Sequence, residues 1–181
     1  MAGLRNNSFS KLMDGSLGYI VYAGAGVFIA FLLNQGLAVA LDTNYPIVAV
    51  VSSSMTHDGT TEARHYQFLE KNFNYTREQI DSWPVKDGFP IGDLPIVVGS
   101  KNYNVGDVVV YLIPGQKVPI IHRIVKQNAD GSFMTKGDHN PDFLSFEKSV
   151  KQSQVQGKVA FIIPKLGYFK VILSEIFGGI V

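Results

Sequence analysis

The feature that most limits what this chain can become is an uncharged segment near its N-terminus. Gly15 to Leu41 contains no Asp, Glu, Lys, Arg or His over 27 residues. A helix of that length is about 40 Å long, which is enough to cross a hydrocarbon core of about 30 Å. The apolar region of a cleaved signal peptide is shorter. We therefore predict a transmembrane anchor over residues 15–41.

The charges before this segment predict its orientation. Arg5 and Lys11 precede it, and only Asp14 opposes them. Positive charge tends to stay on the cytoplasmic side of a membrane. We expect residues 1–14 in the cytoplasm, the chain after Leu41 outside the cell membrane, and membrane lipid as a partner.

Overall composition excludes several classes of function. The net charge of +1, without a basic cluster, gives no electrostatic reason to expect a nucleic-acid partner. The absence of cysteine excludes a thiol nucleophile, thiolate metal sites and disulfides. A chain of 181 residues has room for one domain besides its membrane segments.

Residues 42–164 are predicted to form a small, mainly β domain. Asp130-Gly131 is a turn signal between two apolar runs, so it predicts a hairpin. The fold class expected is an antiparallel β domain behind an N-terminal transmembrane helix. The runs rich in β-branched and aromatic residues cover 107–113, 118–127, 132–136 and 157–163.

Two segments depart from the β pattern. Residues 56–100 read as an insertion with short helices, one over 61–72 and one that Thr76 opens with capping-box spacing to Gln79. We expect this insertion to be a surface elaboration. Residues 165–181 are apolar but carry charges, which favours an interfacial helix or the start of a second membrane segment.

The run Val48 to Met55, V-A-V-V-S-S-S-M, follows the anchor closely and reads as a strand ending in serines. A serine such as Ser54 is a poor nucleophile unless a base takes its proton. His122 lies in an apolar run, on the same predicted face as Ile120 and Ile124. A neutral, partly desolvated imidazole suits a general base near pH 7.

Four sequence blocks occur in a recognisable order. They are S-S-S-M at Ser52–Met55, G-D-V-V-V-Y from Gly106, H-R-I-V from His122 and T-K-G-D-H-N from Thr135. In this order, behind an N-terminal anchor, the blocks resemble type I signal peptidases (peptidase family S26) of the archaeal and endoplasmic-reticulum branch. That branch has histidine where the bacterial enzymes have a lysine base. The resemblance extends from the anchor to about Gly167.

The resemblance implies a role for each block. Ser54 would be the nucleophile and His122 its general base. The backbone N–H of Ser54 and the hydroxyl of Ser52 would stabilise the oxyanion of the tetrahedral intermediate.

The acid that orients the histidine is left open by the sequence. Asp138 is the aspartate of the G-D pair, and Asp142 follows four residues later. In the endoplasmic-reticulum enzymes the later aspartate is the one implied to orient the histidine, although the spacing here is shorter. We favour Asp142 as the partner of His122 and Asp138 as a buried hydrogen-bonding residue of the site, with the reverse as the alternative.

The activity expected is serine endopeptidase cleavage of signal peptides from exported preproteins, after small residues at positions −1 and −3. An extended substrate would add as a strand beside Val48–Ser53, so that Val50, Val51 and Ser53 contact it. No cofactor is expected. The sequence does not indicate accessory subunits or an oligomeric state.

Two other classes of function fit parts of the sequence. Zinc chemistry would need clustered ligands, but no H-E-x-x-H or other tight ligand spacing occurs, so no metal is expected. A catalytically inactive, anchored β-domain scaffold would explain the anchor and strands but not the serine, histidine and aspartate blocks. The histidines available as ligands are His57, His65, His122 and His139.

Overall fold

The structure is a computed structural model that describes residues 16–116 and 118–168. The chain divides into two compact units between Ala40 and Leu41, and each is described by itself. The expectations for residues 1–14 and for most of 165–181 lie outside the described residues.

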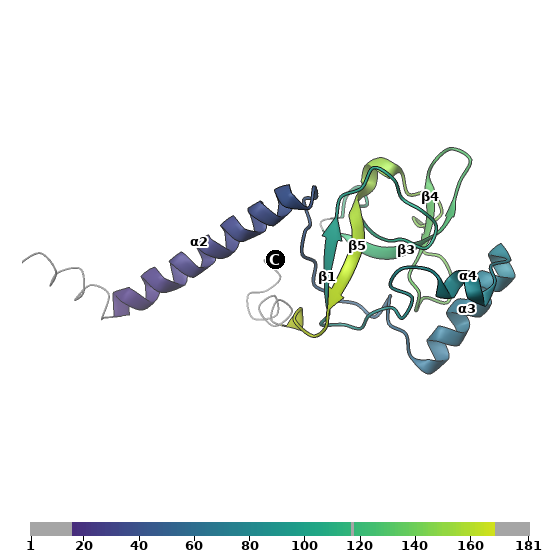
Figure 1. Cartoon of the computed structure of the whole chain (residues 1–181), viewed down its shortest axis with the longest axis horizontal. Coiled ribbons are helices and arrows are strands. Elements are labelled where there is room, and N and C mark those ends of the chain that lie inside the picture. The colour runs from purple at the N-terminus through teal and green to yellow at the C-terminus, as the bar shows by residue number, and fades with distance from the viewer. Residues whose placement is uncertain (1–15, 117, 169–181) are drawn as a thin grey trace, which may run out of the picture. The chain divides into compact units, whose positions relative to one another are not determined.

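The first unit is a single apolar helix, α2 (Ser16–Ala40; Figure 1). Its segment Leu17–Ala40 is long and apolar enough to cross a membrane, and little of it is buried. The helix therefore does not resemble the core helix of a globular unit. Its bounds agree closely with the anchor expected at 15–41.

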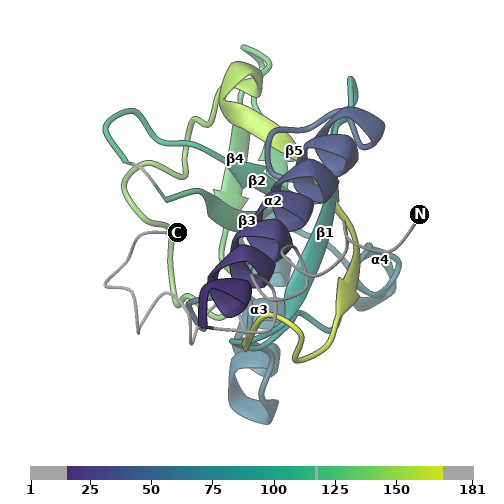
Figure 2. The ribbon, with the colours of Figure 1, turned by 90° about the vertical axis from the view of Figure 1, so that its left-hand side faces the viewer.

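The second unit is built on a five-stranded antiparallel sheet with the strand order β1-β5-β2-β3-β4. Figure 2 shows β1 and β4 toward opposite sides of this sheet. The prediction of a mainly β, antiparallel domain is confirmed. The strands are β1 (Leu94–Val98), β2 (Val108–Tyr111), β3 (Ile120–Gln127), β4 (Phe133–Lys136) and β5 (Val155–Ile163).

Strand β1 was missed by the sequence prediction, which placed Leu94–Val98 inside the insertion. The run Val48–Met55 was predicted as a strand, but it forms no regular ladder, and its last four residues bend into a turn. Its N–H at Val48 donates to the carbonyl of Pro95 (3.2 Å), and Val50 donates to Asp93 (3.0 Å). Proline has no N–H to donate in return, so pairing with β1 stays incomplete.

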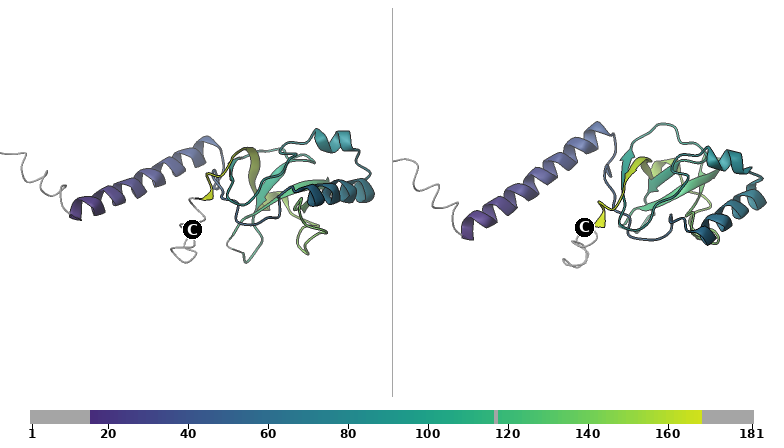
Figure 3. Two further views of the ribbon diagram at one scale, coloured as in Figure 1. Left: turned by 90° about the horizontal axis from the view of Figure 1, so that it is seen from below. Right: turned by 60° about the horizontal axis from the view of Figure 1, so that its bottom comes forward.

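The two predicted helices of the insertion are present as α3 (Gly59–Phe73) and α4 (Arg77–Asp81). Thr76 accepts from the N–H of Gln79 (3.2 Å) in a capping box, as predicted. Asp58 caps α3 in the same way, accepting from Thr61 (3.0 Å). Both views of Figure 3 show the two helices together at one end of the second unit.

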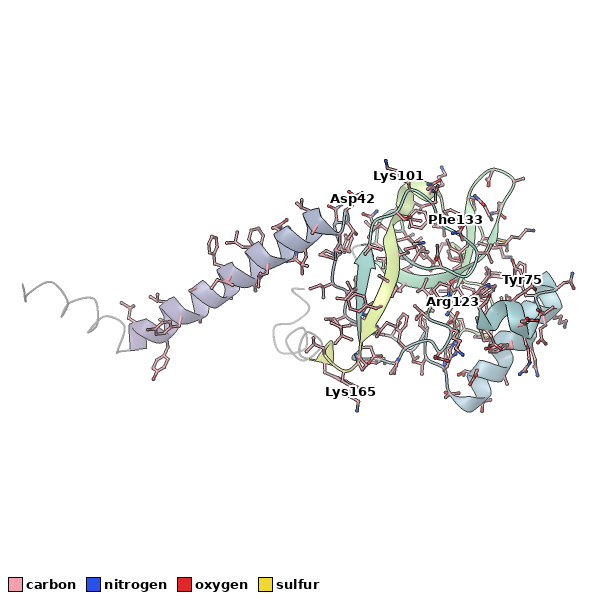
Figure 4. The ribbon with its side chains drawn as sticks, viewed as in Figure 1. Asp42, Tyr75, Lys101, Arg123, Phe133 and Lys165 are labelled. Atoms are coloured by element: carbon pink, nitrogen blue, oxygen red, sulfur yellow. The ribbon has the colours of Figure 1, made fainter. Side chains whose placement is uncertain are left out.

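The insertion helices share a core with the sheet. Leu69 of α3 and Ile80 of α4 are buried in one apolar cluster with Val125 of β3. Tyr75, between the helices, donates its hydroxyl to the carbonyl of Val125 (3.0 Å), and Figure 4 labels it at this end of the unit. The insertion helices are therefore held on the sheet by a shared apolar cluster.

Leu69→Ala should destabilise the whole second unit by about 2–5 kcal/mol, because it opens a cavity in that shared cluster. The free energy of unfolding can be measured in urea through the fluorescence of Trp83, the one tryptophan of the chain. Lys71→Ala, an exposed position on the same helix, is the matched control and should change stability by no more than about 0.5 kcal/mol. Equal stability of the two variants would show that α3 is dispensable.

Candidate active site

The three serines form a turn whose position is fixed by backbone hydrogen bonds. Met55, directly after the turn, is buried in an apolar cluster and packs beneath it. The carbonyl of Ser53 accepts from Thr56 (2.9 Å), and the carbonyl of Ser54 accepts from the N–H of His139 (2.9 Å). The turn is thereby tied to the loop that follows β4.

Within this turn the hydroxyl oxygens of Ser52 and Ser54 lie 3.1 Å apart. Ser52 is exposed and Ser54 is partly exposed. Both hydroxyls therefore lie side by side and face a space that another molecule can reach.

His122 lies in β3, opposite Val109 of β2, and its side chain is almost fully buried. The ring of Tyr111 meets it edge-on, and the Tyr111 hydroxyl lies 3.4 Å from Nδ1. On the other side, Nδ1 lies 2.5 Å from Oε1 of Glu147. The contacts of the imidazole with Glu147 and Tyr111 are therefore both made at Nδ1. Nε2 is the ring nitrogen that remains available to exchange a proton.

His122 and the serine turn meet across Gly137. A methyl group at Gly137 would lie 2.9 Å from Nε2 of His122 and 2.9 Å from the carbonyl oxygen of Ser54. Any side chain there would force the two apart, which explains the glycine of the G-D pair. Among the described residues the Ser54 hydroxyl is bonded to Ser52 and not to His122. Such contacts often tighten only when substrate binds.

A pocket of about 600 Å³ opens over these groups and brings Ser52, Ser54 and His122 together. Its lining comes mainly from two parts of the chain, the segment Tyr45–Met55 and the residues from Val118 to His122. Most of the lining is apolar. The pocket thus places two hydroxyls and one imidazole nitrogen at the end of an apolar groove.

Asp138 lies next to Gly137 but faces the other way, toward Arg123. The Arg123 guanidinium contacts both carboxylate oxygens, with Nη2 2.6 Å from Oδ2. Its remaining donors reach the carbonyls of Pro84, Val85 and Gly106. Burial alone would raise the pKa of Asp138, but the Arg123 charge lowers the pKa well below its usual range.

Asp142 is not the carboxylate beside His122. It is exposed and accepts from the N–H of Phe143 (2.7 Å), so the expected pairing with His122 is corrected by the geometry. The carboxylate at His122 belongs to Glu147, which no sequence pattern singled out.

Comparison with known proteins identifies the family, although no protein-family model matches the chain. The chain is 31% identical over 157 residues to the signal peptidase complex catalytic subunit SEC11 of Saccharomyces cerevisiae, in strains YJM789, RM11-1a and JAY291. The match covers 81% of this chain and 76% of each yeast protein. This chain belongs to the signal peptidase family. The predicted resemblance, and with it the assignment to the proteases, is confirmed.

Beside the pocket, the described residues contain one group with ligand-like spacing, made by His57, His65 and Asp138. Nε2 of His57 lies 3.0 Å from Oδ2 of Asp138, and Nδ1 of His65 lies 3.6 Å from Oδ1. The charge of Asp138 is already balanced by Arg123. A cation would have to compete with the Arg123 guanidinium for the same two carboxylate oxygens. The group is therefore best explained as a buried ion pair flanked by two imidazoles.

Burial lowers the pKa of His65 to about 4, because the charged ring would lose its hydration. The charge of Asp138 opposes this shift, and the positive charges of Arg123 and Lys136 add to it. The unfolded chain takes up this proton near pH 6.5, the folded chain only near pH 4. Between these values the unfolded state binds more protons, so stability is lost as pH falls.

His65→Phe should remove this contribution, so its free energy of unfolding should fall less between pH 6.5 and pH 4 than that of the unchanged chain. Urea unfolding across that range measures the difference. Parallel pH profiles for the two chains would contradict the assignment of a neutral, buried His65.

Proposed function

We propose that the chain is a membrane-bound serine endopeptidase that cleaves N-terminal signal peptides from exported preproteins, after small residues at −1 and −3. The observation that carries the proposal is the convergence of Ser52, Ser54 and His122 in one apolar pocket. Membership of the signal peptidase family gives the substrate class, since the yeast relatives are named as catalytic subunits of a signal peptidase complex.

In the proposed mechanism the Ser54 hydroxyl attacks the carbonyl carbon of the scissile peptide bond. His122 takes the serine proton at Nε2 and delivers it to the departing amine as that bond breaks. Water then attacks the acyl-enzyme, again with His122 as the base, and releases the signal peptide with a free carboxylate. The Ser54 hydroxyl is restored by the proton that His122 returns.

The oxyanion formed at the scissile carbonyl needs donors close to the nucleophile. The proposal assigns this role to the backbone N–H of Ser54 and the hydroxyl of Ser52. Their support is the 3.1 Å separation of the two hydroxyl oxygens, which puts the Ser52 hydroxyl beside the attacking atom. Each such donor is typically worth about 3–4 kcal/mol of the barrier.

The proposed binding mode is strand addition along the pocket wall. The backbone N–H of Val48 bonds to β1 and the backbone groups of Val50 bond to the two residues before β1, whereas Ala49 and Val51 have no backbone partner among the described residues. In an extended chain alternate residues present N–H and C=O to opposite sides. Ala49 and Val51 therefore offer a free edge to a substrate strand, whose side chains would alternate between the groove and solvent.

This edge revises the expected substrate contacts. Val50 lines the pocket but is buried, so Ala49 joins Val51 as a proposed partner of the substrate backbone. Ser53 is exposed, and its carbonyl is already used by Thr56. Its proposed role is limited to contact with the substrate surface.

In this proposal the anchor holds the domain at the membrane surface where its substrate emerges. Helix α2 would hold the domain at the membrane, with residues 1–14 in the cytoplasm and the domain from Leu41 outside the cell membrane. A signal peptide leaves the bilayer at that surface, so an anchored pocket meets it there. The alternative, an inactive anchored scaffold, gives no reason for the hydroxyl pair and the clamped imidazole.

Ser54→Ala and His122→Ala should each reduce processing by a factor on the order of 10⁴–10⁶, because nucleophile and base act as one unit. Ser53→Ala is the matched control in the same turn and should have only a slight effect. The measurement is cleavage of a preprotein by the purified chain in detergent. Robust cleavage by Ser54→Ala would exclude the serine mechanism, and equal activity of all variants would favour a contaminating protease.

Processing should rise between about pH 5 and pH 8, because a histidine base accepts the serine proton only when its ring is neutral. The measurement is a profile of kcat/KM against pH. In His122→Lys the ammonium would stay protonated over this range, so kcat/KM should not rise between pH 5 and pH 8. A profile that is flat from pH 5 to 9, or that falls through neutral pH, would contradict a histidine base.

A further inference from the structure

Glu147 is a fully buried carboxylate that lies at the back of the proposed site. Oε1 lies 2.5 Å from Nδ1 of His122 and accepts from the N–H of Gly137 (3.2 Å). Oε2 accepts from the N–H of Leu144. Two of these three donors belong to the residues that meet at the serine turn.

Burying a carboxylate is costly unless donors replace its hydration. Here the two peptide N–H groups of Gly137 and Leu144 supply part of that replacement, and the imidazole of His122 supplies the rest. A carboxylate at this distance requires Nδ1 of His122 to carry the proton. Nε2 is then the unprotonated nitrogen, on the side of Gly137 and Ser54.

We propose that Glu147 is the positioning residue for His122, fixing the ring with Nδ1 protonated and stabilising the imidazolium that forms when Nε2 takes the serine proton. This inference rests on the proposed serine mechanism. Glu147 does not touch the substrate and acts only through His122, as the third member of a Ser54–His122–Glu147 set.

The geometry favours Glu147 over both aspartates. Asp138 is engaged by Arg123 on the far side of Gly137, and no contact joins it to His122 among the described residues. Asp142 is exposed. A glutamate also fits the distance, because its longer side chain reaches back from the end of the loop after β4.

The first experiment compares Glu147→Gln, Glu147→Asp and Asp142→Asn in preprotein cleavage, with folding checked by urea unfolding. Glutamine keeps the shape but removes the charge, and its NH₂ cannot accept from all three donors. Glu147→Gln should lower kcat by a factor on the order of 10²–10⁴, with KM little changed. In Glu147→Gln the rise of kcat/KM on the acid side of the pH profile (the acid limb) should move to lower pH, because the imidazolium has lost its counter-charge.

Glu147→Asp retains the charge, so it should keep the acid limb nearer that of the unchanged chain and recover part of the turnover. A merely structural role would not separate the two variants in this way. Asp142→Asn is the matched control, an acid of the same loop, and should remain close to the unchanged chain. A fully active Glu147→Gln, or loss of activity in Asp142→Asn alone, would overturn the inference.

A second measurement needs no change at Glu147, so it decides the matter even if the variants fail to fold. The histidine ring nitrogens are labelled with ¹⁵N in the otherwise unchanged chain, and the His122 signals are assigned by difference against His122→Gln. The neutral ring should carry its proton on Nδ1. A neutral ring protonated on Nε2 would overturn the inference.

The outcomes separate this inference from the proposed function. If Ser54→Ala still cleaves the preprotein, the serine mechanism fails, and the inference is overturned with it. If Ser54→Ala and His122→Ala are inactive while Glu147→Gln is fully active, the inference alone fails. Inactive Ser54→Ala, impaired Glu147→Gln and partial rescue by Glu147→Asp support both.

Discussion

The arrangement of the site depends on the buried ion pair between Arg123 and Asp138. Bringing these charges out of water carries a penalty that only full hydrogen bonding can offset. The pair meets that condition, because the guanidinium also binds the carbonyls of Pro84, Val85 and Gly106. One side chain thereby ties β3 to the loop after β4, to the insertion and to the turn before β2. Figure 4 labels Arg123 where the sheet approaches α3 and α4.

Each residue of the Arg123–Asp138 ion pair has a chain neighbour that belongs to the candidate active site. His122 and Arg123 are consecutive on a strand, so their side chains point to opposite faces. Arg123 bonds to the insertion on one face of β3. His122 therefore lies on the other face, where it lines the pocket. Gly137 and Asp138 divide their roles in the same way, since Asp138 holds the arginine while Gly137 admits the imidazole and the serine carbonyl. The register Arg123↔Lys136 brings the two dipeptides together.

Features that depend on a short stretch of sequence could be predicted, whereas contacts between distant residues could not. The long apolar helix, the capping box at Thr76 and the strands β2 to β5 depend on short patterns, and their positions were predicted to within a few residues. Strand β1 was missed because it is short, contains Pro95 and follows a run of turn residues. The pairing of His122 with Glu147 could not be read at all, because it depends on how an irregular loop folds back over nine residues.

That loop has neither helix nor regular strand from 137 to 147, so side-chain contacts define its path. Lys136 donates to the carbonyls of Gly137 and Asn140, and Glu147 accepts from the N–H groups of Gly137 and Leu144. The carboxylate that closes the loop is also the one that contacts His122. The path of the loop and the orientation of the imidazole are therefore set by the same bonds, and neither can change without the other.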